Sequence, residues 1–176
     1  IDYYKKKFNS LPKTILDYGG GTGENAILIS EIYDNKFSFD VVENDSLVRL
    51  ANKNNFTHCK FMSDLEDKNY DIIFSSATLQ YLDEPYDLLK KFEQKSNKLI
   101  SLARLNCNEK QRAKLQVSIY RKNIGYKDFK HISNDNLAIY PYKELSLAKI
   151  KSSFKFFNFK MEKIKTDGFY YCILEK

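Results

Sequence analysis

The stretch that decides the fold is residues 15–23, ILDYGGGTG. A short apolar run over 14–18 ends directly at the glycines, and the apolar spacing over 24–33 is typical of a buried helix. Glycines in such a turn allow unusual backbone angles and let a ligand approach the main chain closely. We therefore expect a strand, a tight turn and a helix, with a ligand bound at the turn.

Strands and helices alternate through the first hundred residues. Further strands are expected at 37–43, 59–62, 70–76 and 98–105. A helix with Asp45 as its N-cap is expected through about Lys53, and another is expected to begin near Pro85. The continuous apolar residues of the strand at 70–76 are typical of a parallel strand covered on both faces. This alternation predicts an α/β fold with a mostly parallel sheet between two layers of helices.

The rest of the chain has a different pattern. Residues 106–141 are predicted to form a polar helix and loop near the carboxyl ends of the strands, where ligands bind in open α/β sheets, so we expect a substrate-side insertion there. Residues 142–154 are predicted to be helical. Strands at 155–166 and 169–174, joined at Asp167-Gly168, are predicted to form an antiparallel hairpin. No linker is visible, so residues 1–176 are predicted to form a single domain.

Composition narrows the class of protein. No apolar stretch approaches the roughly 18 residues of a membrane span, and no signal peptide is visible, so we expect a cytoplasmic protein. The net charge of +6 comes from lysines spread along the chain, which argues against a nucleic-acid surface. Cys59, Cys107 and Cys172 lack paired spacing, which predicts reduced thiols and no metal or disulfide set.

Two kinds of adenosine cofactor bind at glycine turns of this type. The pyrophosphate of a nicotinamide dinucleotide would rest on the helix N-terminus, but Glu24 stands where the third glycine of that pattern belongs. The same pattern can be read from Gly21 to Ala26, but it then begins two residues too late after the strand. Asp17 would also repel a pyrophosphate, because like charges about 4 Å apart cost about 1 to 4 kcal/mol. A cationic cofactor such as S-adenosylmethionine would instead be stabilised by this carboxylate.

Two more acidic residues follow predicted strands. Glu43 ends the second strand, where its carboxylate can accept hydrogen bonds from both ribose hydroxyls, a contact that either cofactor needs. Asp64 follows the third strand and can accept a hydrogen bond from an adenine amino group while Leu65 packs on the ring. Each has a purely structural alternative: Asp17 can cap a helix, Glu43 can be a solvated strand end and Asp64 can be a turn residue.

Residues 14–100 resemble a class I S-adenosylmethionine-dependent methyltransferase. The resemblance rests on ILDYGGGTG, Val42-Glu43, Ser63-Asp64-Leu65 and YDIIFSS at 70–76, which follow one another at that family's usual intervals. It implies a three-layer Rossmann-like sandwich with seven strands, the last antiparallel, and S-adenosyl-L-methionine as cofactor. The cofactor contacts that it implies are Asp17, Tyr18, Gly19, Gly20, Gly21, Gly23, Glu43, Asn44, Asp64, Leu65 and Ser75.

A narrower resemblance covers nearly the whole chain. The stretches ATLQYL at 77–82 with Pro85, Ala103-Arg104, LQV at 115–117 and Tyr140-Pro141 are similar to a branch of these enzymes associated with bacterial surface-polysaccharide genes. This resemblance implies a sugar or sugar-linked acceptor and a role in polysaccharide biosynthesis.

Candidates for acceptor contact follow the fourth and fifth strands. Gln80 and Tyr81 follow the fourth strand, where they can orient the acceptor or simply pack at a helix start. Arg104 can bind a phosphate or carboxylate through its planar fork, or form a structural salt bridge. His131 is the candidate general base, with an ordinary surface histidine as the alternative. No Asn-Pro-Pro-Tyr or Asp-Pro-Pro-Tyr follows the fourth strand, which disfavours methylation of nucleic-acid bases.

The sequence therefore favours a methyltransferase that acts on a hydroxyl of a small-molecule or carbohydrate-type acceptor. One alternative is an NAD(P)-dependent oxidoreductase. Another is a non-catalytic S-adenosylmethionine-binding member of the fold, because the sequence shows no secure base or nucleophile.

Overall fold

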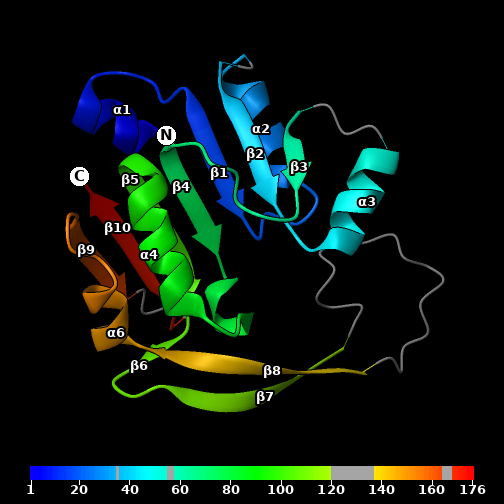
Figure 1. Ribbon diagram of the computed structural model, residues 1–176, viewed down its shortest axis with the longest axis vertical. Helices are drawn as coiled ribbons and strands as arrows, with labels where there is room; N and C mark the ends of the chain where they lie inside the picture. Colours follow the sequence, from blue (N-terminus) through cyan, green and yellow to red (C-terminus); the bar gives the residue numbers. More distant parts are fainter. Residues whose placement is uncertain (35, 55–57, 120–136, 164–167) are drawn as a thin grey trace.

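The glycine stretch forms the turn between the central strand of a sheet and the helix that follows it. The computed structural model describes residues 1–34, 36–54, 58–119, 137–163 and 168–176. The seven strands of the main sheet (Figure 1) lie in the order β3 (Lys60–Met62), β2 (Ser38–Val42), β1 (Thr14–Tyr18), β4 (Tyr70–Ser76), β5 (Ser96–Leu105), β10 (Tyr170–Glu175) and β9 (Asn158–Lys163). The five strands from β3 to β5 are parallel, whereas β10 is antiparallel to both of its neighbours.

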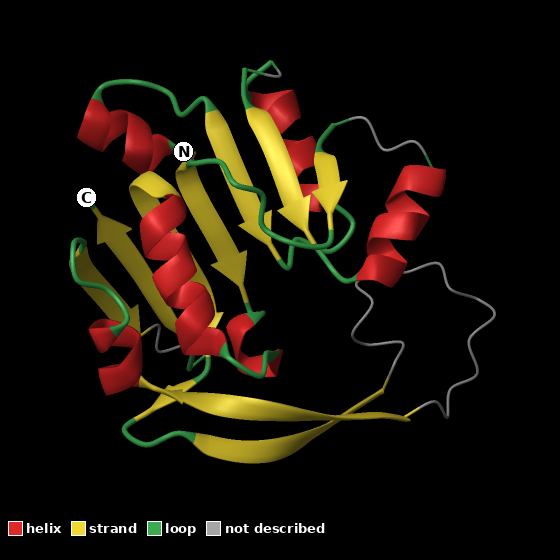
Figure 2. Ribbon diagram, in the orientation of Figure 1, coloured by secondary structure: helices red, strands yellow, loops and turns green. Residues whose placement is uncertain are grey.

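Helices cover both faces of this sheet (Figure 2). The helices of one face are α1 (Asp2–Phe8), α2 (Glu24–Ile32) and α3 (Asp45–Lys53), and those of the other face are α4 (Pro85–Lys95) and α6 (Leu147–Ser152). The α/β/α sandwich with a mostly parallel seven-stranded sheet and an antiparallel last strand is thus confirmed. None of the described helices is long and apolar enough to cross a membrane.

The burial of β4 explains why the sheet needs both helical layers. Ile72 is 5% exposed and packs with Tyr4 of α1, whereas Ile73 is fully buried and packs with Phe92 of α4. Neighbouring residues of a strand point to opposite faces, so an unbroken apolar run needs cover on both sides. The carboxyl ends of the parallel strands consequently meet at one edge, at Tyr18, Val42, Met62, Ser76 and Leu105.

Residues 106–141 differ from the prediction. The described part of this segment forms strands, β6 (Cys107–Asn108), β7 (Arg112–Ile119) and the start of β8 (Leu137–Ser146), instead of a polar helix and loop. β7 and β8 pair antiparallel as a ribbon below the carboxyl edge of the main sheet (Figure 1). The sequence over 112–119 alternates polar and apolar residues strictly, which is the period of a strand and not of a helix.

The predicted helix over 142–154 is wrong in its first part, because β8 continues to Ser146 and α6 begins only at Leu147. Glu144 lies opposite Arg112 in the ribbon and forms an ion pair with Lys114, which favours the strand. The Ser146 side chain then accepts a hydrogen bond from the Lys149 amide as the helix N-cap.

The predicted N-cap of α3 is also wrong by one residue. Asn44, not Asp45, accepts hydrogen bonds from the amides of Ser46 and Leu47, both at 3.1 Å. Asp45 lies in the first turn instead, where its charge favours the helix N-terminus. The predicted hairpin at the end of the chain is confirmed as β9 and β10, although Asp167 of its turn lies outside the described residues.

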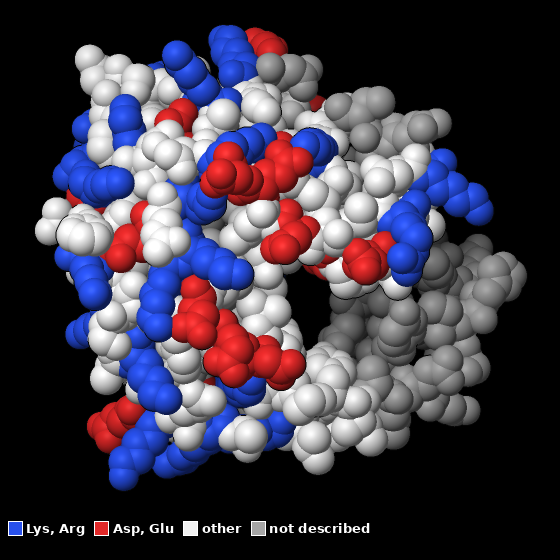
Figure 3. All heavy atoms as spheres, viewed as in Figure 1, with Lys and Arg blue, Asp and Glu red and all other residues white. Residues whose placement is uncertain are grey.

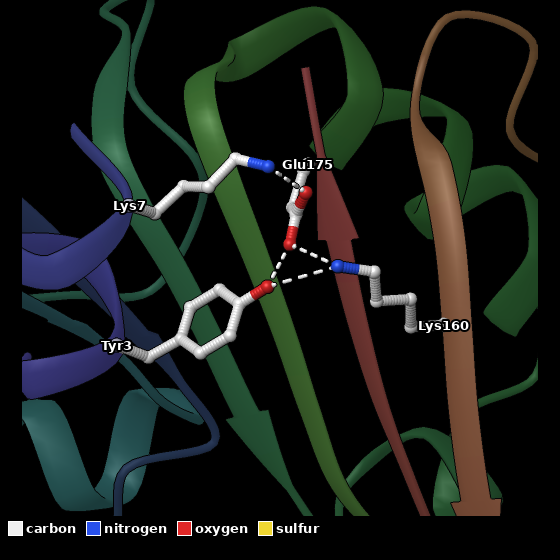
Figure 4. A network of polar contacts seen from close by, with 4 residues as sticks. All are labelled: Tyr3, Lys7, Lys160 and Glu175. Atoms are coloured by element: carbon white, nitrogen blue, oxygen red, sulfur yellow. Dashed lines mark hydrogen bonds and ion pairs between the residues drawn. The ribbon is translucent and has the colours of Figure 1, made fainter.

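A buried carboxylate ties α1 to this hairpin (Figure 4). Glu175 of β10 is 3% exposed and accepts hydrogen bonds from Lys7 Nζ at 2.8 Å and Lys160 Nζ at 2.9 Å. The Tyr3 hydroxyl of α1 donates to the same carboxylate. Residues far apart in the sequence, on α1, β9 and β10, are therefore held at one point.

Replacing this carboxylate should destabilise the fold. Hydrogen bonds to charged groups contribute about 1.5 to 3 kcal/mol, and the solvent exposure of both lysines reduces that value, so we expect Glu175→Gln to lower the free energy of unfolding by about 1 to 2 kcal/mol. Urea denaturation followed by circular dichroism measures this change. Glu162→Gln on the exposed side of β9 is the matched control, and an equal loss in both variants would contradict the assigned role of Glu175.

Candidate functional site

The glycine loop lies at the carboxyl edge of β1. Gly19, Gly21 and Gly23 have positive φ angles of 74°, 61° and 80°. Residues that carry a Cβ atom rarely adopt this backbone conformation. The Gly19 amide donates to Val42 O of β2 at 2.8 Å, which fixes the loop beside the end of that strand. The backbone is thus held in one conformation at the point where parallel strands end.

The loop is closely packed at one glycine and open at another. A Cβ atom on Gly19 would lie 2.1 Å from Thr78 Oγ1, whereas a Cβ atom on Gly21 would have nothing within 4 Å. Thr78 follows β4, so the segment after that strand rests directly on the glycine turn. The open backbone around Gly21 is the part of the loop that a ligand can approach.

Asp17 lies directly behind this loop. It is 1% exposed, and its carboxylate accepts a hydrogen bond from Asn25 Nδ2 at 3.0 Å. A Cβ atom on Gly20 would lie 2.7 Å from Asp17 Cγ, so only glycine leaves room for this carboxylate. Burial raises the pKa of Asp17 from 3.8 to about 6, the Asn25 hydrogen bond opposes the rise, and the charge of Glu43 adds to it. A cation bound here would stabilise the ionised form.

Glu43 is joined to the glycine loop by a hydrogen bond. Its Oε1 accepts from the Gly21 amide at 3.0 Å, and its Oε2 accepts from the Asn44 amide at 3.0 Å and from Asn44 Nδ2 at 3.1 Å. Asn44 therefore holds Glu43 in position while it caps α3. Oε2 already accepts two hydrogen bonds, whereas Oε1 accepts one, so Oε1 keeps a lone pair for a ligand.

The other predicted cofactor residues lie at the same edge. Burial raises the pKa of Tyr18, and the charges of Asp64 and Glu43 raise it further, which places Tyr18 near both carboxylates. Asp64 is exposed and accepts a hydrogen bond from the Leu65 amide at 2.7 Å. Ser75 is buried, and its hydroxyl donates to Tyr18 O at 2.9 Å, so its side chain joins β4 to β1.

Figure 3 shows an opening in the surface beside this edge, above the β7–β8 ribbon, with acidic side chains above it and at its lower left. Asp17, Glu43 and Asp64 supply carboxylates at successive strand ends, next to open glycine backbone. Carboxylates bind ammonium and sulfonium groups and accept from hydroxyl and amino groups, whereas they repel a diphosphate. This set of side chains fits a cationic adenosine cofactor such as S-adenosylmethionine.

The predicted acceptor residues lie beyond β4 and β5. Tyr81 is 43% exposed, and its hydroxyl donates to Gln116 Oε1 of β7 at 3.0 Å. Gln80 is 4% exposed, and among the described side chains its Oε1 is a buried atom without a hydrogen-bond partner. Arg104 is exposed, with its Nε donating to Ser76 Oγ at 2.8 Å. His131 lies outside the described residues.

Two residues with side chains have positive φ angles where β4 and β5 end. Ala77 and Arg104 have φ angles of 55° and 50°, and the Ala77 amide donates to Ala103 O at 3.0 Å. A residue with a side chain in this region costs roughly 1 to 2 kcal/mol, and such residues are common near ligand sites.

Sequence reasoning gave four residues of this region no role of their own in the site. Asn25 and Thr78, which contact Asp17 and Gly19, are ordinary polar residues whose positions only the folded backbone reveals. Gln116 and Tyr140 lie on the β7–β8 ribbon. The alternation over 112–119 could have identified that ribbon, and with it the side chains that face Tyr81.

The chain belongs to a methyltransferase family: its sequence matches the family described as "Methyltransferase domain" over residues 2–133. Among curated proteins, none matches the sequence.

Solved structures with the same fold include several methyltransferases. The plantazolicin methyltransferase BpumL in complex with SAH (S-adenosylhomocysteine) is 16% identical over 99% of this chain and 79% of that chain, with a TM-score of 0.61. The glycopeptide N-methyltransferase MtfA, complexed with S-adenosyl-L-methionine, is 11% identical over 99% of this chain and 86% of that chain, with a TM-score of 0.59. A putative O-methyltransferase from Nostoc punctiforme is 15% identical over 99% of this chain and 54% of that chain, with a TM-score of 0.61. At these identities the likeness establishes the shared fold.

Proposed function

We propose that this protein is an S-adenosylmethionine-dependent methyltransferase that modifies a hydroxyl group of a small-molecule or carbohydrate-type acceptor. The observation that carries the proposal is the buried carboxylate of Asp17 behind an open glycine loop, with Glu43 and Asp64 at the same edge. The match to a methyltransferase family supports it. So does the shared fold with methyltransferases that were crystallised with S-adenosylmethionine or its demethylated product.

Three carboxylates would hold the cofactor. Asp17 would stabilise its positive charge, Glu43 would accept a hydrogen bond from a ribose hydroxyl through Oε1, and Asp64 would accept one from the adenine amino group. Bound S-adenosylmethionine supplies a methyl group already activated by its sulfonium. The work left to the protein is to hold the acceptor oxygen near the methyl group and to exclude water, which can account for most of the acceleration.

The acceptor would bind beyond β4 and β5. We propose that Tyr81 and Arg104 contact it and that residues 106–141 form the substrate-side insertion of a single domain. Gln80 is buried in this structure, so a contact with the acceptor would require a different side-chain rotamer. His131 as general base, a cytoplasmic location and a role in polysaccharide synthesis stay predictions.

The two alternatives make different predictions about ligands. An oxidoreductase would bind NAD(P), which the carboxylates at this edge disfavour electrostatically. A non-catalytic member would bind S-adenosylmethionine without transferring its methyl group. Both alternatives can therefore be tested with the same purified protein.

Isothermal titration calorimetry with S-adenosylmethionine, S-adenosylhomocysteine and NADH tests the cofactor. We expect the two adenosyl compounds to bind in the micromolar range, which corresponds to about −8 kcal/mol, and NADH to show no binding. Transfer of a radioactive methyl group from S-adenosylmethionine to carbohydrate and small-molecule fractions then tests catalysis. Binding of NADH alone would overturn the proposal, and cofactor binding without transfer to any fraction would favour the non-catalytic alternative.

A further inference from the structure

A groove lies between the end of β4 and the β7–β8 ribbon. It has a volume of about 570 Å³ and is lined by Tyr81, Gln116, Tyr140 and Pro141. The Tyr81 and Tyr140 rings meet edge to face, with centroids 5.5 Å apart and an interplanar angle of 64°, and the Tyr142 ring lies 6.5 Å from Tyr81. An aromatic wall with one amide group suits a ring that has an apolar face and polar substituents.

The wall of this groove is preformed. Lys143 of β8 donates from Nζ to Leu82 O at 2.7 Å and to Asp83 O at 2.8 Å, so the ribbon is fastened to the segment after β4. The Tyr81 hydroxyl adds a second link through Gln116. A site built in advance binds its ligand at a lower entropic cost.

The groove is connected to the glycine turn by one short segment. Tyr81 ends a single 3-10 turn, η1 (Leu79–Tyr81), and its amide donates to Thr78 O at 3.0 Å. Thr78 in turn packs on Gly19. A ring bound against Tyr81 would therefore lie beside the edge where the cofactor is proposed to bind.

Arg104 gives this region a positive charge. Within the described residues its one hydrogen bond uses Nε, which leaves the two η nitrogens of the fork available to a ligand. Its partner Ser76 ends β4, the strand that leads into the turn of Tyr81, so the guanidinium lies at the same strand end as the groove. Burial raises the pKa of Tyr81, and the charge of Arg104 opposes that rise. Two lysines in the described part of the ribbon are engaged elsewhere, since Lys114 pairs with Glu144 and Lys143 binds two carbonyl oxygens.

We propose that this groove binds a ring-shaped acceptor that carries both a hydroxyl group and an acidic group, with the ring against Tyr81 and Tyr140 and the acidic group on Arg104. The inference rests on the proposed function and specifies the acceptor. A sugar acid and a hydroxylated aromatic acid share this chemistry. The groove therefore selects acceptors that carry both a ring and a negative charge.

Two pairs of probes test this inference in the presence of saturating S-adenosylhomocysteine. The acidic probes are glucuronate and 4-hydroxybenzoate, and their uncharged counterparts are methyl glucoside and 4-hydroxybenzyl alcohol. Saturation-transfer NMR titrations at low ionic strength measure the four affinities. We expect at least one acid to bind about 10-fold more tightly than its counterpart, as a charge-assisted hydrogen bond of about 1.5 kcal/mol allows. Preferred binding of glucuronate would identify the acceptor as a sugar acid, and preferred binding of 4-hydroxybenzoate would identify it as a hydroxylated aromatic acid.

Three variants separate the two contacts. Arg104→Gln should abolish the preference for the acid, and Tyr140→Leu should weaken both members of the pair by about 2- to 10-fold. Arg112→Gln removes the same charge at the start of β7 and should leave the preference unchanged. The inference is overturned if neither acid binds, or if Arg104→Gln and Arg112→Gln have equal effects. Calorimetry with S-adenosylhomocysteine on the same samples distinguishes the two failures. If the cofactor product binds, only the inference about the acceptor fails; if it does not bind, the proposed function fails.

Discussion

Gly19→Ala is expected to unfold or strongly destabilise the protein and to abolish cofactor binding. An alanine at a φ of 74° costs roughly 1 to 2 kcal/mol, and its Cβ atom would overlap Thr78 Oγ1 at 2.1 Å. Overpacking of this kind adds about 1 to 3 kcal/mol. We expect the melting temperature to fall by about 5 to 15 °C, measured by differential scanning calorimetry.

Gly21→Ala is the matched control for this prediction. Its φ of 61° imposes a similar backbone cost, but its Cβ atom would meet nothing within 4 Å. It should therefore lose only the roughly 1 to 2 kcal/mol of backbone strain. Equal losses of stability in the two variants would show that Thr78 does not constrain the glycine turn.

Asp17→Asn is expected to weaken the binding of S-adenosylhomocysteine by about 10- to 100-fold, because it removes a charged partner worth about 1.5 to 3 kcal/mol. With the pKa of Asp17 at about 6, the carboxylate of the free protein becomes ionised as the pH rises through 6. The affinity of the natural protein should rise up to about pH 7 and then level off. The variant should show no such change, and calorimetry at a series of pH values measures both profiles.

The same substitution should stabilise the free protein at neutral pH. The pKa of Asp17 is raised in the folded state from 3.8 to about 6, so the folded form binds the proton more tightly than the unfolded form between these values. Stability therefore falls as the pH rises through this window, by roughly 3 kcal/mol in total. The uncharged amide of the variant would avoid this loss. A variant that is both less stable at pH 7 and unchanged in cofactor affinity would contradict the role of Asp17.

Much of the main sheet could be predicted because its strands carry strong local signals. Ile72, Ile73 and Phe74 form an unbroken apolar run; the strand is confirmed, with Ile72 and Ile73 buried and Phe74 half-buried. The glycines mark the turn for a physical reason, since Gly19 and Gly20 have no room for a side chain. Apolar runs and clusters of glycine are local features of the chain and are therefore visible in the sequence.

The substrate side was harder to predict because its stability depends on pairing between distant segments. β7 and β8 pair across a long segment, and Lys114 and Glu144 meet only in the folded ribbon. Pro141 lies within β8 and is accommodated there because, among the described strands, that stretch pairs with β7 alone, while β6 pairs only with Leu145 and Ser146. Tertiary context here overrides local preference.

The position of β10 inside the sheet has a consequence for folding during synthesis. β5 is made early, but its antiparallel partner is translated only after all of residues 106–169. Until then, one side of β5 presents unpaired backbone groups next to apolar side chains such as Leu99 and Leu102. Such an edge is a template for aggregation. Ribosome-bound chains that contain β5 but not yet β10 are therefore the form of the protein in greatest need of chaperones.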